Sequence, residues 1–134
     1  MRRAGVLVGL VLASCVSHGV HPLTPQDLAT APYQGTVTSA LTGSLMYEGG
    51  CLLFREDDGK SQLMPVWPDG SVFNGTTLSF HQPGKSDQLI VIAQEFQMEG
   101  QPIPWSTLSA PAYKRIHHQC EVQPFFVSRV RPAN

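Results

Sequence analysis

Charged side chains are scarce in this 134-residue chain. They make up 14% of it, and 9 Lys and Arg residues stand against 10 Asp and Glu residues. A formal net charge of −1 excludes a sequence-independent nucleic-acid binder, which needs a clear basic excess. No helix-period apolar stripe of useful length is present. With 12 Gly and 11 Pro residues, the composition favours one turn-rich β domain over a helical bundle.

Patterns of the common catalytic and nucleotide-binding sites are also lacking. There is no Gly-x-Ser-x-Gly elbow for a nucleophilic serine. Neither a Walker nor a dinucleotide-binding glycine pattern occurs. The acidic run Glu56-Asp57-Asp58 lacks the spacing of a calcium loop. We therefore expect no enzymatic activity and no cofactor.

The N-terminus has the layout of a secretory signal. Two arginines precede an apolar run over Ala4–Ser14, which is too short to span a bilayer. The run ends in Leu12-Ala13-Ser14-Cys15, which resembles the lipobox of bacterial lipoproteins. In that family the Cys sulfur carries diacylglycerol and becomes residue 1 after cleavage. The resemblance implies a signal peptide over residues 1–14 and lipidation at Cys15. The alternative is an ordinary signal cleaved after residues 17–19, which predicts a secreted or periplasmic protein.

Lipidation predicts a domain anchored to a membrane, because two or three acyl chains anchor stably. Inner-membrane retention signals usually carry Asp directly after the Cys, whereas this chain has Val16. The resemblance thus implies a cell-envelope location, at the outer membrane facing the periplasm in a Gram-negative source. The Pro-containing residues 16–34 predict a tether. The expected organisation is a signal at 1–14, a lipidated Cys and tether at 15–34, and a β domain at 35–134.

The rest of the chain predicts short strands separated by turns. Glu48-Gly49-Gly50, Asp58-Gly59 and Asn74-Gly75 are turn signals, because their residues tolerate positive φ. One nearly apolar segment, Gln88–Ala93, is predicted to be central and buried on both faces. One helical turn is expected around Trp105–Leu108. The other predicted strands are Thr36–Leu41, Gly43–Tyr47, Cys51–Arg55, Ser61–Trp67, Thr76–His81 and Val122–Val130.

This spacing favours an all-β fold, as a small OB-like barrel of five to six strands, with an immunoglobulin-like β-sandwich as the alternative. With Cys15 assigned to lipid, Cys51 and Cys120 remain, and export favours a disulfide between them. The alternative is two free buried cysteines.

Two short segments resemble a small exported β domain of bacterial lipoproteins whose function is uncharacterised. They are Gly43–Arg55, with the pattern Gly-x-Leu and then Glu-x-Gly-Cys-Leu, and Val66–Ser71, with Trp-Pro. The resemblance implies a β fold and a disulfide that includes Cys120, but no activity.

Few side chains are candidates for a binding site. A ligand groove would use Trp67, Phe80 or Trp105, although core packing is the ordinary role of such rings. The cluster His117-His118-x-Cys120 has metal-ligand chemistry, but neighbouring histidines on a strand point to opposite faces, so no metal site is expected. Residues 15–109 carry a formal charge of −6 and residues 110–134 one of +3, which is either a solvated strand end or a basic patch for anionic partners.

The sequence therefore predicts a non-enzymatic envelope lipoprotein that binds a protein or polymer of the envelope. A barrel that binds a small ligand or inhibits an enzyme is the alternative. A His-based metal-binding protein is a third possibility.

Overall fold

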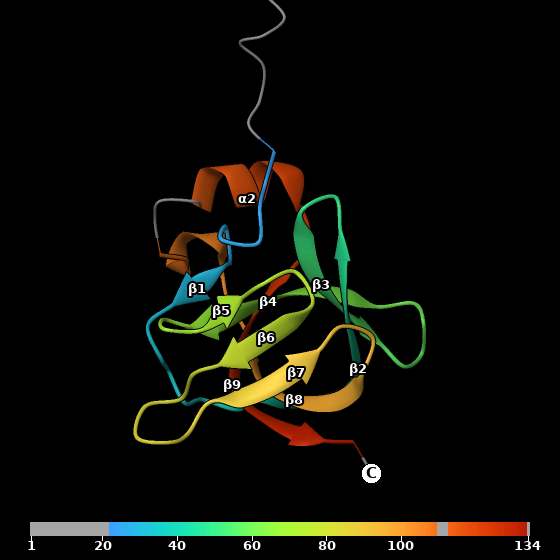
Figure 1. Cartoon of the computed structure of the whole chain (residues 1–134), viewed down its shortest axis with the longest axis vertical. Coiled ribbons are helices and arrows are strands. Elements are labelled where there is room, and N and C mark those ends of the chain that lie inside the picture. Colours follow the sequence, from blue (N-terminus) through green and yellow to red (C-terminus); the bar gives the residue numbers. More distant parts are fainter. Residues whose placement is uncertain (1–21, 110–112, 134) are drawn as a thin grey trace, which may run out of the picture.

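The computed structural model describes residues 22–109 and 113–133, and its core is a barrel of five strands (Figure 1). β2 pairs with both β3 and β8, β3 pairs with β4, and β8 pairs with β9, all antiparallel. A parallel pairing of β4 with β9 closes the ring. The barrel strands are β2 (Ser39–Glu48), β3 (Cys51–Glu56), β4 (Gln62–Pro68), β8 (Glu95–Pro102) and β9 (Pro124–Pro132).

Ring closure distinguishes the two predicted architectures. A sandwich keeps two separate sheets, whereas here every one of the five strands has a partner on each side. The predicted all-β fold is confirmed, with the small barrel as its architecture.

A second, three-stranded sheet lies over the barrel and appears in front of it in Figure 1. Its inner face contributes Phe73, Leu78, Phe80 and Ile90 to the cluster of buried side chains that also fills the barrel. Two edge-to-face ring pairs join the layers, Trp67 with Phe80 and Tyr47 with Phe73. The strands of this sheet are β5 (Val72–Phe73), β6 (Thr77–Phe80) and β7 (Gln88–Val91).

Local turn chemistry sets the hairpins as predicted. Gly49 and Gly50, with φ of +58° and +82°, connect β2 to β3. The side chain of Asp58 accepts the backbone N–H groups of Lys60 and Ser61 before β4. Asn74 does the same for the two residues that lead into β6. These hydrogen bonds join residues two or three positions apart, so the turns can be predicted from the local sequence.

The prediction of a central strand at Gln88–Ala93 is wrong. β7 is an edge strand, in which only Ile90 is buried, while Leu89 and Val91 are 70% and 46% exposed. At Ala93 the backbone has a φ of +73°, which ends the strand in a turn. An apolar run by itself does not distinguish a central strand from an edge strand with an open outer face.

A second cluster of buried side chains lies on the outer face of β3, β4 and β9. Alternation along β3 directs Leu52 and Phe54 into the barrel, and Cys51 and Leu53 outward. The outward side chains are covered by the N-terminal segment, which includes β1 (Thr30–Ala31), and by the helices η1 (Trp105–Thr107) and α2 (Tyr113–Gln119). These strands are therefore buried on both faces.

The N-terminal segment differs from the tether expected up to residue 34. Leu23, Ala29 and Ala31 are buried, and β1 pairs in parallel with the end of β4. Within the described residues, the domain therefore begins at Leu23.

Helix α2 was not predicted either, because a seven-residue helix with one buried side chain, Ile116, is too short for a periodic signal. The helical turn expected around Trp105–Leu108 is present as η1.

Candidate functional site

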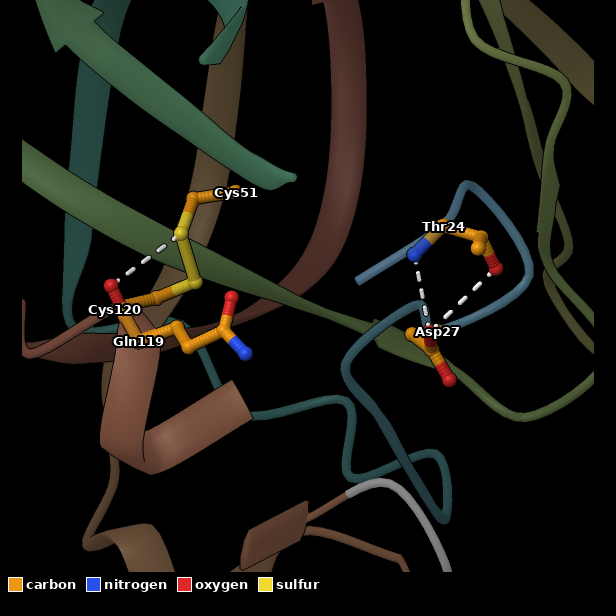
Figure 2. Close-up of a disulfide and its surroundings, with 5 residues drawn as sticks. All are labelled: Thr24, Asp27, Cys51, Gln119 and Cys120. Atoms are coloured by element: carbon orange, nitrogen blue, oxygen red, sulfur yellow. Dashed lines mark hydrogen bonds between the residues drawn. A yellow bond between two sulfur atoms is a disulfide. The ribbon is translucent and has the colours of Figure 1, made fainter. Parts of the chain in front are cut away.

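The disulfide predicted between Cys51 and Cys120 is present, and it joins the barrel to the end of α2 (Figure 2). Cys51 is the first residue of β3, and Cys120 follows α2, with their Cα atoms 5.8 Å apart. Both residues are buried, at 7% and 4% exposure. The Sγ atom of Cys51 also contacts the backbone oxygen of Gln119, at 3.5 Å. The bridge therefore fixes the helix to the barrel across 69 residues of sequence.

The N-terminal segment is held at the same end of the molecule. Leu23 packs on the β2–β3 turn, where a Cβ atom at Gly50 would lie only 2.7 Å from the Cβ of Leu23. The backbone N–H and the hydroxyl of Thr24 donate to the carboxylate of Asp27, at 2.9 and 3.3 Å (Figure 2). The N–H of Asp27 donates back to the Thr24 carbonyl at 2.8 Å. A short turn results.

An ion pair links this turn to α2. The guanidinium of Arg115 lies 2.5 Å from the carboxylate of Asp27, whose side chain is 14% exposed. The Thr24 N–H lowers the pKa of Asp27, and the Arg115 guanidinium lowers it further against the opposing effect of burial. Burial raises the pKa of Tyr47, and the negative charge of the nearby Asp27 carboxylate raises it further. The ionised form of Asp27 is thus the one that the fold stabilises.

A stack of rings covers the outer surface of α2. The indole of Trp105 lies on the imidazole of His117, with centroids 4.2 Å and planes 17° apart. The ring of Tyr113 lies beside this pair, 5.9 Å from His117 and 6.5 Å from Trp105. Beside the stack is an open hollow of about 390 Å³, lined by Tyr113, Lys114, His117, His118 and Glu121. Aromatic and cationic groups therefore meet at the surface of this helix.

The space beneath the N-terminal segment is small. A cavity of about 20 Å³ lies between this segment, the disulfide and the barrel. That volume holds about one water molecule, far below the several hundred Å³ of an organic ligand site. The segment is thus packed closely on the outer face of β3 and β4.

Of the three rings predicted as a ligand platform, two are in contact inside the core and the third lies elsewhere. Trp67 and Phe80 lie in the barrel cluster with no exposed surface, and their centroids are 6.0 Å apart. Trp105 packs against the other cluster, at the α2 end. A ligand role for these rings stays a prediction, and in this conformation only Trp105 has surface to offer.

The residues weighed as a metal cluster have a different geometry from the one assumed. His117 and His118 lie on a helix and not on a strand, so the argument from opposite strand faces was wrong. The sulfur of Cys120 is bonded to Cys51. Within residues 22–109 and 113–133, no group of three or more His, Cys, Asp or Glu side chains is placed to hold a metal ion.

The C-terminal basic residues do not form one patch. Lys114 and Arg115 are on α2, whereas Arg129 and Arg131 are on β9. Both β9 arginines pair with Glu99 of β8, at 2.8 and 3.3 Å. The positive charge near the C-terminus is therefore divided between two places and largely paired with carboxylates.

Sequence reasoning missed the contribution of Asp27 and Arg115 to the site. The Thr24-Pro-Gln-Asp27 stretch does signal a short turn, but nothing local connects it to a residue 88 positions away.

The predicted signal at residues 1–14 and lipidation site at Cys15 lie outside the described residues. Among the helices that the structure describes, none is long and apolar enough to cross a membrane. No protein-family model, curated protein or solved structure matches the chain in the comparisons made.

Proposed function

We propose that the protein is a non-enzymatic lipoprotein of the cell envelope, anchored through lipidated Cys15. In a Gram-negative source its place is the outer membrane, facing the periplasm. The observation that carries the proposal is the Leu12-Ala13-Ser14-Cys15 lipobox at the end of a signal-shaped segment. The packed domain begins at Leu23, so a short connection separates the proposed anchor from the fold.

The disulfide supports an exported location. Disulfides persist in oxidising compartments and are rare in reducing ones. A bridge between Cys51 and Cys120 leaves Cys15 as the one cysteine of the sequence outside that bridge, and lipidation requires a free thiol.

The small sheet supports a role as a binding or structural module. Val72 on β5 and Leu89 on β7 are 63% and 70% exposed. Both are in register with Ser79 of the central strand β6, so they share the outer face of the sheet. Exposed apolar side chains on one face are typical of protein-contacting surfaces, which favours an envelope protein as partner.

The alternative of a small-ligand or inhibitor barrel has less support. OB-type barrels bind ligands on the face of their second and third strands, which are β3 and β4 here. That face is covered by the chain itself, through Leu23, Ala31 and Ile116. Ligand binding there would require the N-terminal segment to leave its site.

The anchor is tested by expressing the full chain, with its signal, as wild type and as Cys15→Ala. We expect the wild type to enter the detergent phase in Triton X-114 partitioning and to incorporate an alkyne-labelled fatty acid. Cys15→Ala should do neither. The double variant Cys51→Ala/Cys120→Ala is the matched control, because it removes the two bridged cysteines but leaves Cys15. Detergent partitioning or fatty-acid labelling of Cys15→Ala at the wild-type level would refute the proposal.

A further inference from the structure

The described chain begins at one defined end of the domain. Pro22 precedes the buried Leu23, which is wedged against the β2–β3 turn. Figure 1 shows this start beside α2, whereas the C-terminus lies at the opposite end of the molecule. The Asp27–Arg115 ion pair holds the segment to the helix. Whatever precedes Pro22 therefore leaves the domain next to α2.

The connection to the proposed anchor is short. Pro22 is seven positions after Cys15 in the sequence. At full extension these seven steps span about 25 Å, since each step covers at most about 3.6 Å. A domain of this size is roughly 35 Å across. The tether is thus shorter than the domain, and it keeps the α2 end near the bilayer surface.

The side chains at this end suit the headgroup layer of a membrane. Trp and Tyr are enriched at membrane–water interfaces, where an apolar ring and a polar edge both find partners. Trp105 and Tyr113 are half-buried and line the α2 surface together with His117. Lys114 is exposed and has no salt bridge to any described residue, so its ammonium group is available for lipid phosphates.

Charged groups of both signs lie at this end of the molecule. On α2 the cationic or titratable groups Lys114, His117 and His118 are exposed, and Glu121 is the acidic residue that lines the same hollow. Glu48, the last residue of β2, and Asp27, which pairs with Arg115, are further acidic groups near this end.

We propose that the α2 end, formed by Trp105, Tyr113, Lys114, His117 and His118, lies in the phospholipid headgroup layer when the protein is anchored. The inference rests on the proposed lipid anchor and adds an orientation to it. The small sheet, with its exposed Leu89, is then left accessible to a partner in the aqueous compartment.

The two tryptophans make this orientation measurable. Trp67 has no exposed surface, whereas Trp105 lies at the α2 end. The lipidated full-length protein is reconstituted into vesicles of phosphatidylcholine and phosphatidylglycerol, with or without brominated acyl chains, which quench indole fluorescence on close approach. We expect bromine to remove most of the Trp105 emission. In Trp105→Phe, the remaining Trp67 emission should be the same in both kinds of vesicle.

Two reporters in the Trp105→Phe background provide the matched comparison. His118→Trp places an indole on α2 and should be quenched, while Ala133→Trp places one near the C-terminus and should not. If the protein floats with the vesicles but the α2 indoles are not quenched, or the Ala133→Trp indole is quenched equally, the orientation is refuted and the anchor stands. If the protein does not float with the vesicles, the proposed function fails, and the orientation fails with it.

Discussion

The carboxylate of Asp27 and the guanidinium of Arg115 lie 2.5 Å apart and join two segments that are 88 residues apart in sequence. One belongs to the segment before β1 and the other to α2, so the pair fixes the start of the domain to its one α-helix in the described ranges. The disulfide holds the other end of the same helix. Together they make the α2 end a single packed unit.

Asp27→Ala should lower the free energy of unfolding by about 1–2 kcal/mol, because it removes both the Arg115 pair and the acceptor for the Thr24 N–H. Arg115→Ala should cost about 0.5 kcal/mol, since its side chain is 46% exposed. A double-mutant cycle by urea denaturation measures the coupling, which we expect to be about 0.5 kcal/mol. Lys114→Ala is the neutral control. A coupling of zero would mean that the pair does not form in solution.

The pH dependence of stability should include a contribution from Asp27. Its pKa is lowered in the folded state, so the contribution is present above the unfolded pKa of about 4 and is lost as pH falls through the folded value. We expect urea midpoints to fall below pH 4 and to fall less steeply in Asp27→Asn. The lowered pKa values of Asp58 and Asp87 account for part of the remaining slope. An unchanged slope in Asp27→Asn would contradict this assignment.

Removal of the disulfide should destabilise the domain by about 4 kcal/mol in the chain-entropy model, because the bridge closes a long loop. The measurement compares denaturation of the wild type with that of Cys51→Ala/Cys120→Ala. Intact mass of the unreduced wild type should be two hydrogens below that of the reduced protein. An equal mass before and after reduction would show that the bridge is absent.

Gly100→Ala should destabilise the barrel by about 2–4 kcal/mol. Gly100 lies at the bulge between β8 and β9, where a Cβ atom would come within 1.7 Å of the Phe126 carbonyl oxygen. Gly84→Ala is the matched control, since its φ is +76° but nothing lies within 4 Å of the added atom. That variant should lose only about 1–2 kcal/mol from backbone strain. Equal losses would argue against the close strand contact.

Ala93→Gly should raise the free energy of unfolding by up to about 1 kcal/mol. Ala93 has a φ of +73°, in the left-handed region that disfavours a Cβ atom. Its N–H donates to the carbonyl of Leu45 at 2.9 Å, which holds the backbone in place. Thermal unfolding by circular dichroism measures the change. A clear loss of stability would indicate that residue 93 does not adopt this conformation.

The disulfide was predictable because the cysteine count and the predicted export signal together leave two cysteines to pair. The residues around the bridge were not predictable. The contact of Leu23 with Gly50 and the ion pair of Asp27 with Arg115 carry no local signal. Helix α2 is too short for periodicity, and its position depends on Ile116 docking onto the outer face of the barrel.

The sequence by itself determined the hairpins, because Gly49-Gly50, Asp58-Gly59 and Asn74-Gly75 satisfy their turns through their own backbone and side chains. It also determined the all-β class, through strand lengths and turn spacing. Only the tertiary structure decided that β4 closes on β9, that β7 is an edge strand and that the N-terminal segment covers the barrel. Those outcomes depend on contacts between segments far apart in sequence. Whether an apolar side chain is buried depends on which distant segment covers it, and the local sequence does not specify that segment.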